Sequence, residues 1–398
     1  MRRFRIGSAF GIPIQLDLTF LLVLPLFAWL IGSQVEQWSG LVNDVWGAGF
    51  DAAVLTTGAL PWLLGIASAL GLFTGVVLHE LGHSLVAKRY GFPIESITLW
   101  LFGGIAQLTE MPEDWRTELY IAVAGPVVSV ILGGLSYVAF VSIPATGSIL
   151  VESVRFVLSY LAVVNVALAI FNLMPGFPMD GGRVLRALLA RTRPYARATQ
   201  IAAEVGKGFA ILLGLFGLLA AFNPFLIALA FFIYIGAASE AQQTTMRAAF
   251  EGVEVQDIMT PADRVQTVSP DASVADLIDL MFRERHTGYP VERDGEVVGL
   301  VTLEDARAVR EVERDAFTVS DVMTADVQTV APETDVMTAL EALEDNDIGR
   351  LLVHDGEDFV GLLTRTDIMT ALSIIKTSGR YGDASLPEAE PELVRPGT

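Results

Sequence analysis

The sequence predicts a multi-span α-helical membrane domain with about six membrane helices, followed by a soluble α+β domain. Two observations support this prediction. Hydrophobic residues make up 52% of the chain and gather in long runs before about residue 245, which is too apolar for an ordinary soluble protein. Beyond about residue 250 these runs stop, and a charged segment with an internal repeat begins. A chain of 398 residues is long enough for at least two domains.

Six apolar segments have nearly the length that a membrane helix needs, or more. They lie at about 18–33, 61–87, 119–143, 155–174, 206–221 and 223–238. Only Asn223-Pro224 separates the last two, which predicts a tight helical hairpin. We interpret the first as a retained helix, because no small-x-small cleavage site follows it. The segment between the first two spans, 34–60, is expected to be a loop.

Basic residues indicate how these spans are oriented. With six crossings they gather on one side of the membrane, namely Arg2, Arg3, Arg5, Lys88, Arg89, Arg183, Arg186, Arg191, Arg193, Arg197 and Lys207. The 34–60 loop carries no Lys or Arg. The positive-inside rule therefore predicts a multi-pass protein of the cell membrane with both termini in the cytoplasm.

The net charge of −20 lies on the C-terminal part. Residues 1–250 hold 14 basic and 14 acidic side chains, whereas residues 251–398 hold 12 and 32. This argues against nucleic acid as a partner. An acidic surface with almost no lysine favours a high-salt cytoplasm, as in a halophilic archaeon, although an ordinary acidic domain is the alternative. The chain has no cysteine, which excludes disulfides and thiolate chemistry.

The second apolar segment ends in the motif His-Glu-x-x-His, formed by His79, Glu80 and His83. Positions i and i+4 of a helix share a face, so both imidazoles can reach one metal ion. Zinc suits such a pair, and Glu80 is placed to take a proton from an activated water. The alternative is a wetted cluster at the helix end or a proton relay.

A third protein ligand is expected near the end of the fourth span. Residues 172–182 read NLMPGFPMDGG. The second and fourth spans end on the same side of the membrane, so Asp180 is expected at about the depth of the histidines. Prolines and glycines break the helix there, and irregular backbone near a membrane usually lines a cavity. The alternative is a solvated aspartate in a helix-ending turn.

Over about residues 1–245 the sequence resembles the site-2 protease family of intramembrane zinc metalloproteases (peptidase M50). The resemblance rests on the His-Glu-x-x-His motif and on the 172–181 segment, whose aspartate is the family's third ligand. Segments 101–104 (LFGG), 124–126 (AGP) and 10–14 (FGIPI) are also similar. Many relatives carry a histidine where this chain has Asp17. We therefore assign no catalytic role to Asp17.

The resemblance implies an enzyme that hydrolyses peptide bonds in or beside the bilayer. One zinc ion per chain would be held by His79, His83 and Asp180, with Glu80 as base and then proton donor. The substrate would be a transmembrane protein such as a membrane-anchored regulator. Asn172 would hold the substrate or an oxyanion, with a helix C-cap as the alternative. Gly103 and Gly104 would lie in a non-spanning hairpin whose edge pairs with an unwound substrate.

The soluble part contains two similar units. Residues 257–260 (DIMT) recur 64 positions later at 321–324 (DVMT), and residues 299–302 (GLVT) recur 62 positions later at 361–364 (GLLT). Each unit is predicted to contain a short strand, a helix, two strands and a helix. Residues 379–398 are rich in Pro, Glu and Gly and are expected to be a disordered tail.

The repeat resembles a tandem pair of CBS modules, at about 254–314 and 317–376. Such pairs often bind adenine nucleotides in the cleft between the modules. The resemblance places ribose contacts on Thr-x-x-Asp patterns, which are Thr302/Asp305 and Thr364/Asp367 here, with Arg350 and Arg365 as counter-charges. The alternatives are a plain helix-capping box and a dimerisation role for the pair.

Two other functions fit part of the sequence. A transporter or channel regulated by CBS modules would explain six spans, but not both metal motifs, and paired broken helices in matching halves are missing. A protease-like scaffold without activity finds no support, because every ligand type is present.

Overall fold

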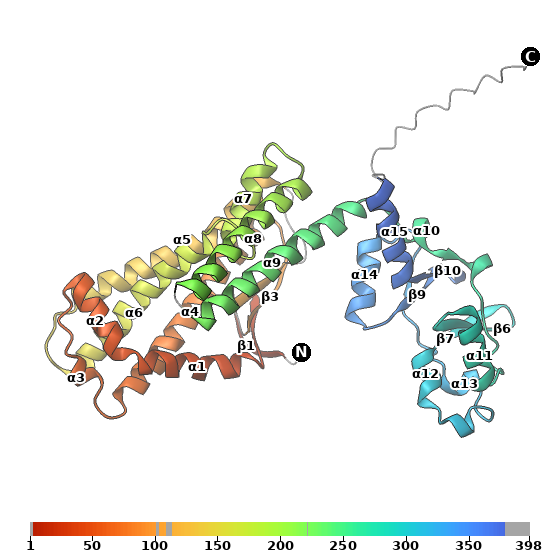
Figure 1. Cartoon of the computed structure of the whole chain (residues 1–398), viewed down its shortest axis with the longest axis horizontal. Helices are drawn as coiled ribbons and strands as arrows, with labels where there is room; N and C mark the ends of the chain where they lie inside the picture. The colour runs from red at the N-terminus through yellow and green to blue at the C-terminus, as the bar shows by residue number, and fades with distance from the viewer. Residues whose placement is uncertain (1–2, 101–102, 109–113, 221, 379–398) are drawn as a thin grey trace, which may run out of the picture. The chain divides into compact units, whose positions relative to one another are not determined.

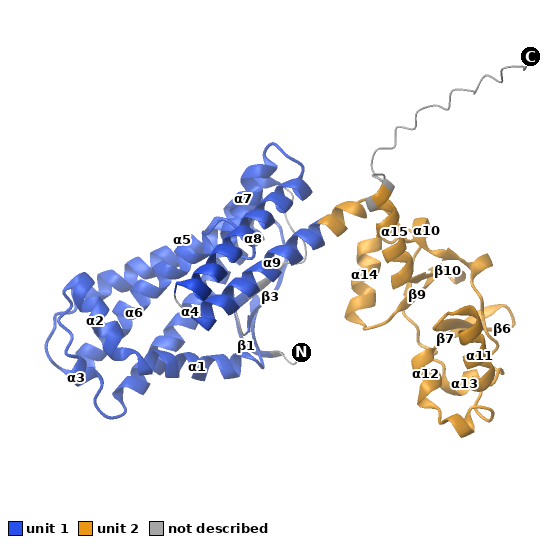
Figure 2. Ribbon diagram, viewed as in Figure 1, with its two compact units in different colours: residues 1–244 blue, residues 245–398 orange. Residues whose placement is uncertain are grey.

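The structure is a computed structural model that describes residues 3–100, 103–108, 114–220 and 222–378. It divides into two compact units, residues 1–244 and residues 245–398, coloured separately in Figure 2. The predicted tail at 379–398 lies outside the described residues.

Long apolar helices dominate the first unit and confirm the predicted membrane domain. Five are long and apolar enough to cross a bilayer: α4 (Leu60–Arg89), α5 (Trp115–Ser142), α6 (Ile149–Asn172), α8 (Tyr195–Leu219) and α9 (Pro224–Ala249). They run side by side in Figure 1. The predicted hairpin at Asn223-Pro224 is confirmed, because α8 ends at Leu219 and α9 begins at Pro224.

The first predicted span differs from the expectation. Helix α1 (Phe20–Ser33) has 14 residues and so measures about 21 Å, which is short of a hydrocarbon core of about 30 Å. Helix α2 (Val35–Trp46) follows it with a bend of 61°. The six-span count therefore holds only if this bent pair counts as one span.

Residues 34–60 were expected to be a loop, and this prediction was wrong. They contain α2 and the short helix α3 (Ala52–Leu55). Val35 and Val42 of α2 are buried in a cluster with Phe140 and Phe156 of the membrane helices. This amphipathic burial holds α2 in place without a long apolar run.

Small residues let the membrane helices approach closely. A Cβ atom on Gly65 of α4 would overlap the backbone of α1 at Ala28, and one on Gly82 would press against the backbone of α5 at Ala124. Such contacts are the usual means of packing helices in a bilayer, where apolar side chains gain little from meeting one another. The Gly82 contact brings the histidine-bearing part of α4 against α5.

A four-stranded sheet, in the order β1-β2-β3-β4, belongs to the same unit. Its strands are β1 (Arg3–Ala9), β2 (Ile12–Asp17), β3 (Ile94–Trp100) and β4 (Gly103–Leu108). Strands β2 and β3 are parallel, and the other neighbours are antiparallel. Ile12 and Ile97 of the sheet pack on Leu81 of α4. The sequence indicated the β3–β4 hairpin as a non-spanning stretch, but it did not reveal β1 and β2.

The second unit contains the two predicted repeats. The first comprises α11 (Val274–Glu284), β6 (Gly288–Arg293), β7 (Glu296–Thr302) and α12 (Leu303–Ala308). The second comprises β8 (Thr329–Val330), α14 (Val336–Asp345), β9 (Arg350–Asp355), β10 (Asp358–Thr364) and α15 (Arg365–Ser378). Each repeat has its own apolar core. The expected first strand of repeat one is reduced to a single bridge between Val268 and Val291.

Candidate metal centre

Helix α4 presents His79 and His83 on one face, one turn apart. Both side chains are buried, with 3% of each residue exposed. Buried imidazoles in a membrane helix are costly unless their nitrogens find partners. The neighbouring helix α5 and the start of α7 (Asp180–Ala190) supply these partners.

Asp180 is the first residue of α7, which follows an irregular segment at 173–179. The sequence predicted broken backbone around this position and did not reveal the new helix. Gly181 and Gly182 allow the tight approach, because a Cβ atom on either would overlap the backbone at Leu173 or Gly176. The helix start is thereby pressed against the preceding segment, and the carboxylate is directed at the histidines.

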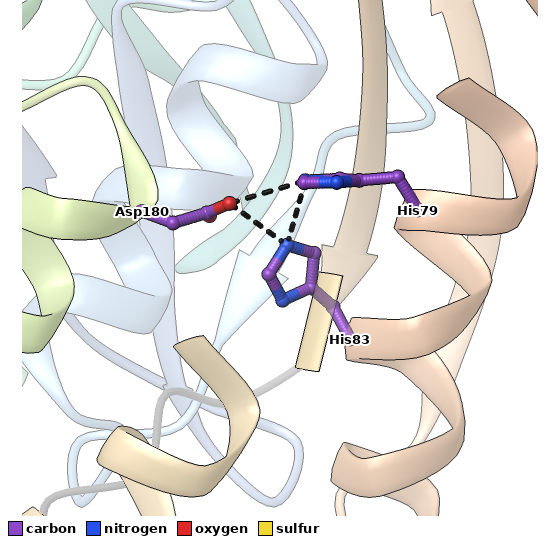
Figure 3. Close-up of side chains that lie close together, drawn as sticks. All are labelled: His79, His83 and Asp180. Atoms are coloured by element: carbon purple, nitrogen blue, oxygen red, sulfur yellow. Dashed lines mark hydrogen bonds and ion pairs between the residues drawn. The ribbon is translucent and has the colours of Figure 1, made fainter. Parts of the chain in front are cut away.

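The three predicted ligands meet at one point, as Figure 3 shows. Oδ2 of Asp180 lies 3.1 Å from Nε2 of His79 and 3.1 Å from Nε2 of His83, and the two Nε2 atoms are 3.2 Å apart. These residues form a group able to hold a metal ion, although 97 positions separate His83 from Asp180 in the chain.

The spacing of the group fits zinc. Zinc–nitrogen bonds of 2.0–2.1 Å in a tetrahedral site imply ligand atoms about 3.3 Å apart, which is close to the three distances above. The other ring nitrogens have partners of the kind that metal-binding histidines use. Nδ1 of His83 lies 2.7 Å from the Ile121 carbonyl oxygen, and Nδ1 of His79 lies 2.9 Å from Oγ of Ser129. A carbonyl only accepts, so this contact needs the proton on Nδ1 of His83, and Nε2 is the nitrogen that could bind a metal.

Glu80 is half-buried beside the metal group and contributes none of its ligand atoms. Its side chain lies against Gly104 at the start of β4, where an added Cβ would come within 2.6 Å of its Cγ. Gly103 has a φ of +130°, a conformation that favours glycine. The two predicted glycines therefore place strand β4 next to the predicted base.

Asn172 is the last residue of α6 and is half-buried. The helix is capped by the backbone at Leu173, and the Asn172 side chain makes no hydrogen bond to another residue that the structure describes. Asp17 is placed differently. It accepts hydrogen bonds from the backbone and hydroxyl of Thr19 at the start of α1.

Several residues of the site were not predicted from the sequence. They are Ser129 and the carbonyl of Ile121, which orient the histidines, and Gly125, which packs on both imidazoles. The segment 124–126 resembled a family segment, and this was the only signal near them. Nothing in the sequence pointed to Ile121, because its contribution is a backbone atom.

The second unit contains a cleft of about 760 Å³ lined by both repeats. Thr302 and Asp305 lie on it, together with Asp347 and Arg350. Burial lowers the pKa of the Arg350 guanidinium, and the carboxylate of Asp305 opposes this shift. Nη1 of Arg350 is buried without a partner among the described residues, while Nη2 donates to Thr287.

Both Thr-x-x-Asp patterns form capping boxes. The carboxylate of Asp305 accepts from the backbone and hydroxyl of Thr302, and Asp367 does the same for Thr364. Both aspartates therefore have the helix-capping role that the sequence analysis gave as the alternative to nucleotide binding. Thr364 and Asp367 are not among the residues that line the cleft, and Arg365 donates instead to the Leu343 carbonyl.

Comparison with known proteins agrees with this site. The model of peptidase family M50 matches residues 67–147 and 138–213, and the CBS domain model matches 255–311 and 319–374. A zinc metalloprotease of Methanocaldococcus jannaschii is 35% identical over 381 residues, which are 95% of this chain and 98% of that protein. Rip3 of Mycobacterium tuberculosis is 33% identical over 389 residues, 93% of each chain.

Among solved structures, a site-2 protease from Methanocaldococcus jannaschii shares 38% identity and a TM-score of 0.40, covering 60% of this chain and 95% of its own. The fold and the metal group define a multi-pass membrane metalloprotease. By its likeness to relatives along almost the whole length, the chain belongs to the zinc metalloproteases of peptidase family M50, with a C-terminal pair of CBS domains. The transporter or channel alternative is not favoured.

Proposed function

We propose that His79, His83 and Asp180 hold the catalytic zinc ion and that Glu80 is the general base. The convergence of two imidazole nitrogens and one carboxylate oxygen within 3.2 Å carries this proposal. Bound zinc supplies a Lewis acid for the scissile carbonyl and makes water a stronger nucleophile. Glu80 accepts the proton of the attacking water and returns it to the leaving amine. Asn172, half-buried at the end of α6, is proposed to donate to the substrate or oxyanion.

The substrate proposed is a transmembrane protein whose helix unwinds at the cut. Strand β4 is at the edge of its sheet and has no second partner strand among the described residues. An extended segment can add to such an edge through main-chain hydrogen bonds. Because Gly104 touches Glu80, a segment bound along β4 would lie beside the base.

The CBS pair is proposed to bind an adenine nucleotide in the cytoplasm, within domain limits of 254–314 and 317–376. Support comes from the cleft and from Arg350, a basic residue that lines it. Asp305 lines the same cleft and would accept a hydrogen bond from a ribose hydroxyl. Thr364 and Asp367 are proposed to do the same at the equivalent position of module two. The acidic surface favours measurement in molar salt, as for a halophilic protein.

Association of two chains through the CBS pair is a second proposed role.

Metal content and cleavage together test the catalytic proposal. Purified protein should hold one zinc per chain, and His79→Ala, His83→Ala and Asp180→Ala should each lose most of it. Glu80→Gln should keep zinc but lower cleavage of a co-expressed single-span substrate by about 10²–10⁴-fold, because only the base is removed. Full zinc and activity in Asp180→Ala would rule out this third ligand.

A further inference from the structure

A buried guanidinium connects the metal centre to two other helices. Arg186 lies on α7, six residues after Asp180, and only 1% of it is exposed. Its Nε donates to Oε1 of Glu118 at 2.7 Å, and its Nη1 donates to Oε1 of Glu240 at 2.6 Å. Its guanidinium carbon also lies 4.8 Å from the ring centroids of Phe177 and Tyr195. Two carboxylates and two aromatic rings therefore hold α7 in place through Arg186.

The contact with Glu118 joins the two halves of the metal group. Glu118 is in the first turn of α5, three residues before Ile121, whose carbonyl orients His83. The same helix carries Ser129, the partner of His79. The ion pair therefore holds the helix that provides Asp180 against the helix that orients both histidines. Phe177, in the segment before Asp180, is held by the same guanidinium.

The contact with Glu240 connects Arg186 to α9. This helix begins at Pro224 and ends at Ala249, beyond the boundary of the first unit at residue 244. Phe250, just after the helix, belongs to the core of the second unit, and Met246 and Ala249 pack against that core. Helix α9 thus begins in the first unit and ends in the second.

We infer that Arg186 is a positioning residue that sets the place of Asp180 relative to His79 and His83, and that Glu240 links this placement to α9. A displacement of α9 along its axis would pull on Arg186 and so on α7. Because zinc affinity depends on ligand placement, such a displacement would alter the metal centre. The inference rests on the zinc site proposed above.

Metal binding by the full-length protein in detergent tests this inference. Zinc affinity is measured by competition with a chromophoric chelator, and ligand geometry by the visible absorption of the cobalt-substituted protein. Arg186→Met should weaken zinc binding by about tenfold or more and shift the cobalt spectrum, as loss of groups behind metal ligands does. Arg186→Lys, which keeps a charge, should restore part of both. Glu118→Gln and Glu240→Gln should move both readouts in the same direction.

A matched control is available in the same bundle. Arg155 is also buried, pairs with Glu152 at 2.7 Å and lies over the rings of Phe50 and Phe140. Arg155→Met should destabilise the fold, followed by thermal unfolding, yet leave the cobalt spectrum unchanged. If Arg155→Met and Arg186→Met have equal effects on zinc, the role of Arg186 is general stability and the inference fails.

The outcomes separate this inference from the zinc proposal. A wild-type chain without zinc overturns the proposed function itself. Tight zinc binding in wild type, with unchanged affinity and spectrum in Arg186→Met, overturns only the positioning role. If Arg186→Met does not fold, Arg186→Lys and Glu118→Gln decide the question by the same readouts. An unchanged Glu240→Gln variant removes the link to α9.

Discussion

Gly125 of α5 faces His83 of α4 so closely that a Cβ atom on the glycine would overlap Nε2 of the imidazole. The same added atom would also crowd Nε2 of His79. These are the two nitrogens that face Asp180. The absence of a side chain at residue 125 is therefore a requirement of the metal group and not only of helix packing.

Gly125→Ala should accordingly disturb zinc binding. The methyl group must displace one or both imidazoles, and we expect zinc affinity and proteolysis to fall by about 10–100-fold, as for other changes behind metal ligands. Metal content after dialysis and cleavage of a model substrate measure the effect. Gly134→Ala is the control, because it lies on the same helix with nothing within 4 Å of its added Cβ. Equal zinc retention in both variants would contradict the prediction.

The hydroxyl of Ser129 is the second point at which α5 acts on the site. It lies 2.9 Å from Nδ1 of His79, and Ser129→Ala leaves that nitrogen without its partner. We expect zinc affinity to weaken by about tenfold while the fold is kept. Ser68→Ala is a fitting control, since Ser68 is equally buried but its hydroxyl has no hydrogen-bond partner among the described residues. A loss of zinc in the control alone would argue against this role.

The residues that we propose as metal ligands could be identified from the sequence, one pair by its spacing and the third by the membrane topology. His79 and His83 have a helical spacing, and the count of membrane spans put Asp180 at the same depth. Gly125, by contrast, is one of 36 glycines, and only the packing of α5 on α4 distinguishes it. Arg186 appeared to be one of several basic residues in a cytoplasmic segment, whereas the structure buries it between two carboxylates.

The fold was predictable to a similar extent. Runs of apolar residues identify long helices, because the bilayer imposes their length. Strand β2 pairs in parallel with β3, which lies about 80 positions away in the chain. Local sequence patterns do not predict such a distant pairing. Helix α2 was not predicted because its stability also depends on distant residues. Val42 is buried by Phe140 and Phe156 of other helices.

The orientation of the spans can be tested with reporters. A reporter fused after residue 245 of a truncated chain should be cytoplasmic, because the positive-inside rule predicts that the side with the basic residues is inside. The expected loop at 34–60 would offer an insertion site such as Asp44, but Asp44 lies within α2. Gly147, in the turn between α5 and α6, is the better site and should be outside. A cytoplasmic reporter at Gly147 would break the six-span topology.

Nucleotide binding in the cleft can be separated from helix capping by a pair of matched aspartates. Asp305 caps α12 and lines the cleft, whereas Asp321 forms the same box with Thr318 at α13 (Val319–Val322) and is not among the lining residues. Each change to alanine should lower the stability of the fragment slightly through the lost cap.

Only Asp305→Ala should also weaken ATP binding, by about tenfold or more, because it removes a charge-assisted hydrogen bond to the ribose. Residues 245–398 are the fragment to use, because a start at residue 251 would remove Phe250 from the core and Met246 and Ala249, which pack against it. ATP, ADP and AMP titrations in molar salt, followed by thermal shift, give the affinities. Equal weakening by Asp321→Ala would assign the effect to capping, and no shift with any nucleotide at millimolar concentration would leave dimerisation as the role of the CBS pair.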